Sequence, residues 1–340
     1  MIPVSVITGF LGSGKTTLLA RLLRDPGMSR TAVIINEFGA VGLDHELVET
    51  SDESFVRLSN GCLCCNVRSD LTLTLGDLAV RRAAGTVPPF ERVVIETTGL
   101  ADPAPILHAL MTDRDLGEVY SLDGVVTTVD ALTGLSTLEQ HGESLRQAAV
   151  ADRIVLTKTD VPRVDVDAIA NRLKTINPGA PILTAVHGAI SPAFLFDAGL
   201  YTTAHKHPDV HAWLAEEAHA AASGKPHAHH GDDIRSFCIV RDEPLRAVTL
   251  ALLMSALAEN CGADLLRVKG IVGIVESPGS PAVIHGVQHV YHSPVWLERW
   301  PSQDRRTRMV FIGCNLRESW VRALVDLLDA EVAEESTLRA

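Results

Sequence analysis

Short apolar runs alternate with helical patterns through the first part of this chain. Six runs have the length and composition of buried parallel strands: Val4–Thr8, Ala32–Asn36, Val93–Glu96, Gly124–Val129, Ile154–Thr157 and Pro181–Ala185. Apolar residues recur with helical spacing in Lys15–Arg24, Pro105–Met111, Leu138–Ala151 and Val166–Ile176. Alternating strands and helices predict an α/β domain with a mostly parallel sheet and helices on both faces. Ligands of such a sheet bind at the carboxyl ends of its strands.

The pattern changes after residue 201. Half of the 14 histidines lie in residues 202–233, among Ala, Gly and acidic residues, which predicts a His-rich linker with a short helix around Val210–Ala222. Further on, the pattern predicts strands at Ile234–Val240, Leu265–Val275, Ala282–Tyr291 and Arg308–Ile312, and helices at Leu245–Asn260 and Ser319–Leu328. We therefore expect a domain over 1–201, a linker over 202–233 and a smaller α+β domain over 234–340.

Composition narrows the class of protein. The formal net charge is −12, and neither part of the chain has the basic excess of a nucleic-acid binder. No apolar run is long enough for a membrane span and no signal peptide is visible, so we expect a cytoplasmic protein. Three of the six cysteines lie close together, which in such a protein favours metal binding or redox chemistry over disulfides.

A glycine-rich string joins the first predicted strand to the first predicted helix. Residues 9–17 match the phosphate-loop pattern G-x-x-x-x-G-K-[ST]. Backbone N–H groups of such a loop converge on an anion, and the helix N-terminus adds partial positive charge. The alternative is a structural glycine-rich turn. The predicted nucleotide-binding residues here are Gly9, Gly12, Ser13, Gly14, Lys15, Thr16 and Thr17, with Lys15 on the β- and γ-phosphates and Thr16 on Mg²⁺.

A carboxylate ends the third predicted strand, in the string Glu96-Thr97-Thr98-Gly99. In GTP-hydrolysing proteins an Asp-x-x-Gly string at this place binds Mg²⁺ through water, and its glycine N–H contacts the γ-phosphate. Glu96 stands here in place of Asp. We predict that Glu96 joins Lys15 and Thr16 as the catalytic group and that Gly99 contacts nucleotide. A carboxylate that caps a helix is the alternative.

The string Thr157-Lys158-Thr159-Asp160 follows another predicted strand. The Asp160 carboxylate would accept two hydrogen bonds from guanine, whose donor pair adenine lacks. Lys158 would lay its methylene stem along the base. Thr157 replaces the usual Asn, and its hydroxyl can make one of the Asn contacts but not both. The string favours GTP over ATP, and a solvated Lys/Asp pair is the alternative.

Cys62, Cys64 and Cys65 lie within four residues of one another. Thiolates bind Zn²⁺ in tetrahedral sites. Three thiolates leave one position for another ligand, which suits a site that passes metal on. Glu37 closes the second predicted strand and is a further candidate ligand, for this metal or for nucleotide-bound Mg²⁺; His45 and Glu46 are weaker candidates. Buried core cysteines or a redox pair are the alternatives.

Two other groups carry a less specific signal. The segment His227–Asp233 suits low-affinity metal gathering or a plain polar linker. Arg305, Arg306 and Arg308 precede the strand Met309–Ile312. For these arginines a solvated strand entrance is favoured over a patch for partner docking or nucleotide sensing.

Together, the strings at 9–17, 36–39, 61–65, 96–103 and 157–160 resemble in order and spacing the CobW-type metal-handling P-loop GTPases, relatives of the urease and hydrogenase maturation GTPases. Segments 267–270, 286–289 and 311–313 resemble the C-terminal domain of that family. The resemblance implies hydrolysis of GTP with Mg²⁺, coupled to binding of Zn²⁺ or Co²⁺ by Cys62, Cys64, Cys65 and Glu37 and to delivery of that ion to a client protein. Zinc chaperones, cobalt-delivery accessory proteins of cobalamin synthesis and nitrile-hydratase activators all remain open.

The motifs suggest that the two sites are linked. Bound GTP would order the loop 36–49, and the cysteine loop begins shortly after it, so hydrolysis would release the metal ion. We expect slow intrinsic turnover, because no arginine finger or water-positioning Gln is evident. The rivals are a P-loop kinase or ATPase with an incidental cysteine cluster and a non-catalytic zinc-buffering or adaptor protein. A homodimer is also left open.

Overall fold

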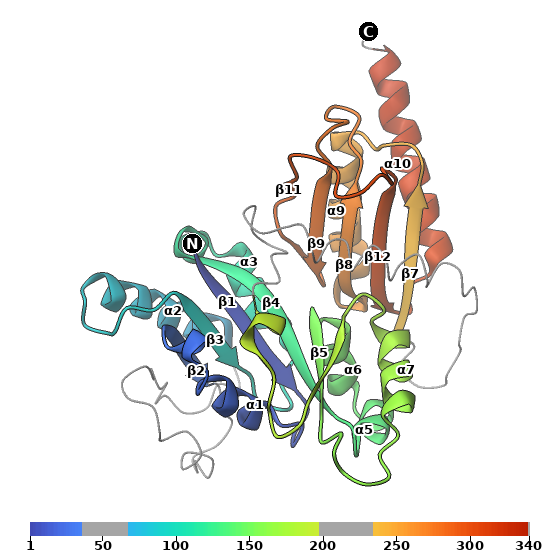
Figure 1. Cartoon of the computed structure of the whole chain (residues 1–340). Helices are drawn as coiled ribbons and strands as arrows, with labels where there is room; N and C mark the ends of the chain where they lie inside the picture. Colours follow the sequence, from blue (N-terminus) through green and yellow to red (C-terminus); the bar gives the residue numbers. More distant parts are fainter. Residues whose placement is uncertain (36–66, 197–233, 339–340) are drawn as a thin grey trace. The chain divides into compact units, whose positions relative to one another are not determined.

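A computed structural model of the chain describes residues 1–35, 67–196 and 234–338, and these fall into two compact units (Figure 1). The first unit runs from Met1 to Lys174 and resumes at Ala180. The second takes Thr175–Gly179 and the C-terminal part of the chain. Each unit has a sheet and a hydrophobic core of its own.

The first unit is built on a sheet of six parallel strands in the order β2-β3-β1-β4-β5-β6. β1 lies in the middle, between β3 and β4, so the chain moves outward in both directions from it. Such a switch point is where open α/β sheets bind ligands, at the carboxyl ends of the strands. The predicted parallel sheet is confirmed, with strands β1 (Ile2–Gly9), β2 (Thr31–Ile35), β3 (Arg92–Glu96), β4 (Tyr120–Asp130), β5 (Arg153–Thr157) and β6 (Ile182–Ala185).

Helices cover both faces of this sheet. On one face, leucines of α1 (Lys15–Leu22) pack against Ile7, Val33 and Val126. The strand residues that alternate with these point to the opposite face, and they are buried too. On that face α3 (Ala104–Thr112) contacts β4, and α6 (Gly142–Ala149) contacts β1 (Figure 1). The other helical elements of this unit are η1 (Pro26–Met28), α2 (Val67–Ala83), α4 (Arg114–Val119), α5 (Gly134–Gln140), α7 (Val166–Ile176) and η3 (Pro192–Phe194).

Two predicted elements were wrong in extent. The helix expected over Leu138–Ala151 is two helices, α5 and α6, because His141 between them is extended, with φ −128° and ψ 108°. The His141 ring stacks on Phe10, with ring centroids 4.5 Å apart. The strand expected over Ala282–Tyr291 is likewise interrupted, since Gln288 has a φ of +53° and turns the chain.

The second unit is a largely antiparallel sheet with two long helices on one face. Its strands are β7 (Ile234–Arg241), β8 (Leu265–Val272), β9 (Ala282–Val287), β10 (Val290–Tyr291), β11 (Val295–Trp296) and β12 (Thr307–Cys314). Leucines of α9 (Ala247–Cys261) and valines of α10 (Glu318–Leu338) form one core with alternate residues of the strands. The short helix η4 (Gly262–Asp264) follows α9. This confirms the α+β prediction for the C-terminal part.

Within the described ranges, no helix of either unit combines the length and the apolar character needed to cross a bilayer.

Candidate functional site

The phosphate loop lies at the carboxyl end of β1, in the middle of the parallel sheet. Gly9 ends β1 with φ +144°, and a Cβ there would lie 2.4 Å from the carbonyl oxygen of Thr128 on β4. Only glycine therefore fits where the chain leaves the sheet. Gly12 and Gly14 also have left-handed φ angles, of +73° and +91°, and Gly14 begins α1 without a side-chain cap. Gly14 has no side chain that could cap the first turn of α1, and a helix N-terminus of this kind suits an anion.

Lys15 points back into this loop and is 8% exposed. Its Nζ donates to the carbonyl oxygens of Gly9, at 2.9 Å, and Phe10, at 3.1 Å. These bonds place the ammonium at the centre of the turn. Ser13 is buried, with its hydroxyl 2.6 Å from that of Thr128, whereas the Thr17 side chain is exposed in the first turn of α1.

Thr16 and Glu96 meet although 80 residues separate them. The Thr16 hydroxyl donates to Glu96 Oε1 at 2.7 Å, and Glu96 is 4% exposed. The register of the sheet causes this meeting, because Glu96 ends β3 directly beside Ile7 of β1. A hydroxyl and a carboxylate next to the phosphate loop are the hard oxygen donors that Mg²⁺ prefers, so the residues fit this ion.

The turn after β3 lies directly against the phosphate loop. Ala101 N–H donates to the Thr98 carbonyl at 3.1 Å, which closes the turn, and a Cβ on Gly99 would lie 2.7 Å from the Leu11 nitrogen. The structure thus brings Gly99, Glu96 and the phosphate loop together. Gln147 of α6 also contacts this turn, and no motif pointed to it.

Thr157 connects the string Thr157–Asp160 to the phosphate loop. Its hydroxyl donates to the Ser13 carbonyl at 2.8 Å and lies 3.4 Å from the Val129 carbonyl. The threonine is 6% exposed, so these bonds are shielded from water. The hydroxyl therefore holds two segments of the site together through main-chain carbonyls.

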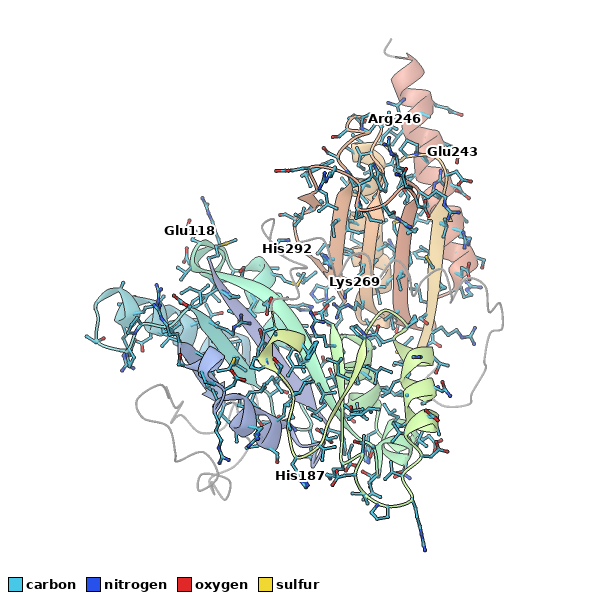
Figure 2. All side chains as sticks on the ribbon, in the orientation of Figure 1. Glu118, His187, Glu243, Arg246, Lys269 and His292 are labelled. Carbon is cyan, nitrogen blue, oxygen red and sulfur yellow. The ribbon has the colours of Figure 1, made fainter. Side chains whose placement is uncertain are left out.

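Two residues that the sequence analysis missed contact the other members of this string. Lys158 has φ +55°, and its Nζ lies 2.5 Å from Oδ2 of Asp130, which ends β4. His187 has φ +50° and lies after β6, with its Nε2 3.5 Å from Asp160 Oδ2 (Figure 2). A carboxylate at a strand end was a signal that could have identified Asp130; nothing in the sequence places His187 beside Asp160.

The predicted metal ligands lie outside the described residues. This applies to Glu37, Cys62, Cys64 and Cys65, to His45 and Glu46, and to the His-rich segment 202–233. Within residues 1–35, 67–196 and 234–338 there is no cluster of three or more His, Cys, Asp or Glu suited to a metal ion. The metal site therefore stays a prediction.

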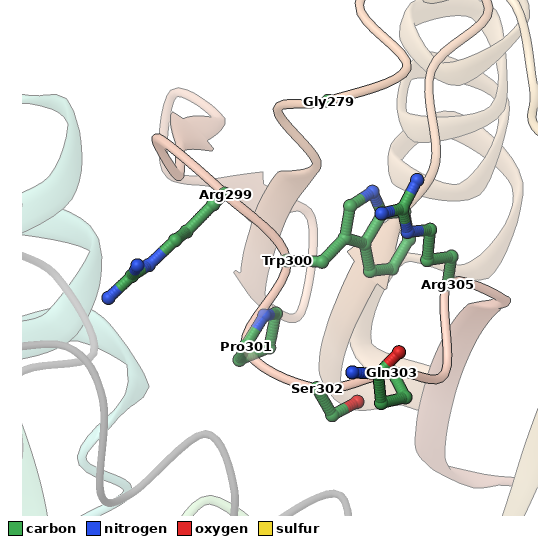
Figure 3. A pocket seen from close by; sticks show the side chains of 7 residues that line it. All are labelled: Gly279, Arg299, Trp300, Pro301, Ser302, Gln303 and Arg305. Carbon is green, nitrogen blue, oxygen red and sulfur yellow. The ribbon is translucent and has the colours of Figure 1, made fainter.

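Asp304 pairs with two arginines near the start of β12, Arg306 just before the strand and Arg308 within it. Asp304 accepts from Arg306 Nη2 at 2.9 Å and from Arg308 Nη1 at 3.0 Å. Arg305 instead lines a hollow of about 550 Å³, together with Arg299 and Trp300 (Figure 3). Arg308 is 7% exposed, so the expected solvated strand entrance was wrong for this arginine.

Comparisons with known proteins agree with this geometry. Residues 3–184 match the family described as CobW/HypB/UreG, nucleotide-binding domain, and residues 234–328 match the cobalamin synthesis protein CobW C-terminal domain. Among curated proteins, the zinc chaperone YjiA of Escherichia coli K12 is 36% identical over 326 residues, covering 95% of this chain and 97% of that protein. Zinc-regulated GTPase metalloprotein activator 1 of Dictyostelium discoideum is 29% identical, covering 97% and 81%.

Solved structures are similar to this chain in the same way. The Zn(II)-bound YjiA GTPase from E. coli has a TM-score of 0.70 and 31% identity, covering 96% of this chain and 98% of that one. A Zn(II)-bound triple mutant of YjiA has a TM-score of 0.72 and 32% identity, with the same coverage. These findings confirm the resemblance drawn from the sequence and the predicted fold class. The chain therefore belongs to the CobW/HypB/UreG family of nucleotide-binding proteins and carries the CobW C-terminal domain.

Proposed function

We propose that this protein is a GTP-hydrolysing metallochaperone that takes Zn²⁺ or Co²⁺ as cargo and delivers it to a client protein. One observation carries the proposal: Lys15 lies inside a phosphate loop whose Thr16 is hydrogen-bonded to Glu96, in a chain related over nearly its whole length to zinc chaperones. The first-turn N–H groups of α1 and the Lys15 ammonium bind the triphosphate.

The residues at the centre of the site have different roles in GTP hydrolysis. Lys15 exchanges its bonds to the Gly9 and Phe10 carbonyls for bonds to β- and γ-phosphate oxygens. Thr16 and Glu96, whose side chains meet beside the phosphate loop, would hold Mg²⁺. When bound, this ion neutralises charge that develops on the phosphate oxygens. Gly99 contacts the γ-phosphate through its N–H.

Guanine selection is assigned to Asp160. Lys158 lies along the base, and Asp130 holds the Lys158 ammonium.

The alternative is a P-loop kinase or ATPase, and the variant Asp160→Asn distinguishes a GTP-selective protein from one that uses ATP. By isothermal titration we expect the wild-type protein to prefer GTP to ATP, and the variant to lose at least tenfold in GTP affinity while ATP affinity changes little. ATP preference in the wild-type protein contradicts guanine selection.

The cargo site is assigned to Cys62, Cys64, Cys65 and Glu37, and the loop 36–49 links it to the nucleotide. Metal analysis of protein purified without chelator, followed by Zn²⁺ titration with GDP and with a non-hydrolysable GTP analogue, tests this assignment. We expect tighter binding in one nucleotide state and loss of binding in Cys64→Ala, but not in Cys314→Ala, which removes a thiol outside the triplet. Equal affinities remove the switch but leave metal binding standing.

The proposal also includes where the protein acts, what it assembles with and whether it turns over GTP. We place the protein in the cytoplasm, where thiols stay reduced. The client is a metalloprotein, and a homodimer is one assembly for delivery. The alternative is a zinc-buffering or adaptor protein, which would bind metal but would not hydrolyse GTP above background, even in the presence of its partners. A GTP turnover assay with metal added distinguishes this alternative from a GTP-hydrolysing chaperone.

A further inference from the structure

The side chain of Gln147 joins α6 to the turn that follows β3. Gln147 is 1% exposed. Its amide Nε2 donates to the carbonyl oxygen of Gly99 at 3.2 Å and to that of Ala101 at 3.0 Å. These acceptors lie 48 and 46 residues away along the chain. One buried side chain thus fixes two carbonyls of a turn that touches the phosphate loop.

The chemistry of the amide leaves one orientation. Both acceptors are carbonyl oxygens, so the NH₂ group must face them, and both of its N–H donors are used. Gln147 Oε1 is buried and has no hydrogen-bond partner within the described part of the chain. A buried acceptor of this kind costs free energy, so the two bonds to the turn account for the amide at this position.

The turn Thr98–Ala101 is held from within by its own main chain and on one side by the phosphate loop. Its closing bond runs from Ala101 N–H to the Thr98 carbonyl, and its inner side rests on the backbone of Leu11. Leu100 at its tip is 55% exposed. The two Gln147 bonds therefore orient the peptide groups on either side of this exposed tip.

The helix end of the connection is fixed as well. The main-chain carbonyl of Gln147 accepts from the Thr127 hydroxyl on β4 at 2.8 Å. Thr127 is 1% exposed, and β4 is the neighbour of β1 in the sheet. The Gln147 side chain thus extends from a point of α6 that is hydrogen-bonded to the sheet carrying the phosphate loop.

We propose that Gln147 is a positioning residue for GTP hydrolysis, which holds the turn Thr98–Ala101 where its Gly99 N–H meets the γ-phosphate. The inference rests on the proposed GTPase function. Gln147 does not orient the attacking water, because main-chain carbonyls take both of its amide hydrogens and its Oε1 is buried away from solvent. GDP has no γ-phosphate, so Gln147 acts on the difference between GTP and GDP rather than on nucleotide binding in general.

The variant Gln147→Leu removes both donors and keeps most of the volume. We expect the affinity for a non-hydrolysable GTP analogue and the kcat for GTP each to fall about tenfold, while the affinity for GDP changes less than about twofold. Titration calorimetry and single-turnover hydrolysis measure these values. Equal loss for both nucleotides, or no loss for either, overturns the proposal.

Two further variants complete the test. Thr307→Val removes a buried hydroxyl in the second unit, which accepts from Gly273 N–H at 2.9 Å, so the ratio of GTP-analogue to GDP affinity should stay at the wild-type value. If the leucine variant does not fold, Gln147→Met repeats the test with a more flexible side chain. If both variants lose GDP binding, Gln147 serves only to maintain the fold and the proposal fails. Wild-type protein that binds neither nucleotide contradicts the proposed function instead.

Discussion

At the scale of single residues, Thr157 shows how a departure from a motif is accommodated. The usual Asn would offer an amide with two kinds of polar atom, whereas Thr157 has one hydroxyl and a methyl group. The hydroxyl takes the Ser13 carbonyl as its acceptor, and the methyl carbon lies 3.4 Å from the position of a Cβ on Gly14. Thr157 therefore contacts the phosphate loop through a side chain that is smaller than Asn.

Thr157→Val keeps the shape and removes the hydroxyl, so the Ser13 carbonyl loses a buried donor. We expect GDP affinity to fall about fivefold, the effect of a lost hydrogen bond of about 1 kcal/mol. Calorimetric titration checks this. Thr307→Val is the control, since Thr307 accepts from Gly273 N–H at 2.9 Å in the second unit and should affect stability but not nucleotide affinity. Unchanged GDP affinity in Thr157→Val would show that the bond is dispensable.

Asp304 gives a pH prediction at the same scale. Hydrogen bonding from Arg306, helped by the charge of Arg308, lowers the pKa of Asp304 from 3.8 to about 2. Because the folded pKa is depressed, the stabilising contribution is complete above the unfolded pKa and is lost as pH falls through about 2.

Asp304→Asn should therefore lower the free energy of unfolding by about 1 kcal/mol at neutral pH and have little effect near pH 2. Urea unfolding followed by tryptophan fluorescence measures the difference at each pH. Glu259→Gln on the exposed side of α9 removes one negative charge elsewhere in the unit and should show neither effect. A pH-independent loss in Asp304→Asn would mean that packing, not charge, matters there.

At the scale of elements, two turns from different strands are packed against each other at the switch point. The turn after β3 meets the loop after β1, and Gly99 permits the contact because a Cβ would lie 2.7 Å from the Leu11 nitrogen and 2.8 Å from its Cα. Both atoms are backbone, which cannot move aside as a flexible side chain can. The nucleotide site therefore depends on this close approach of two turns.

Gly99→Ala should push the turns apart and lower kcat for GTP about tenfold or more, since overpacking costs about 1–3 kcal/mol. Steady-state phosphate release measures the loss. Gly76→Ala in α2 is the matched control: a Cβ there meets nothing within 4 Å, and alanine is the better helix former, so kcat should be unchanged and stability slightly higher. Normal turnover in Gly99→Ala would refute the steric argument.

At the scale of the whole molecule, the two compact units each bury their own core. Leucines of α9, valines of α10 and residues of β8, β9 and β12 form one cluster in the second unit. α1 and the parallel strands form another in the first. Since each core is complete within its own unit, we expect each unit to unfold as a cooperative body.

Residues 234–340 expressed alone should fold, with a sigmoidal thermal transition and no response to GDP. In the full chain, GDP at about 100 times its Kd should stabilise the first unit by about 2.7 kcal/mol. Circular dichroism and calorimetry measure both. A fragment that stays unfolded would show that the second core needs the rest of the chain.

The sequence alone predicted the elements of the fold and the phosphate, magnesium and guanine motifs. It could do so because each of these signals is local: strands and helices have distinct apolar periods, and a phosphate loop needs its glycines and lysine within a few residues. The break at His141 was not predicted, because the apolar spacing continues across it and the stacking partner Phe10 lies far away in the chain.

Only the tertiary structure decided which distant side chains complete the site. Gln147, Asp130 and His187 carry no motif, and each is brought to its partner by the sheet order and the helix packing. Thr16 and Glu96 were both predicted, but their hydrogen bond follows from the pairing of β1 with β3. Local chemistry is encoded in neighbouring residues, whereas contacts across many residues depend on the register and packing that the folded chain alone establishes.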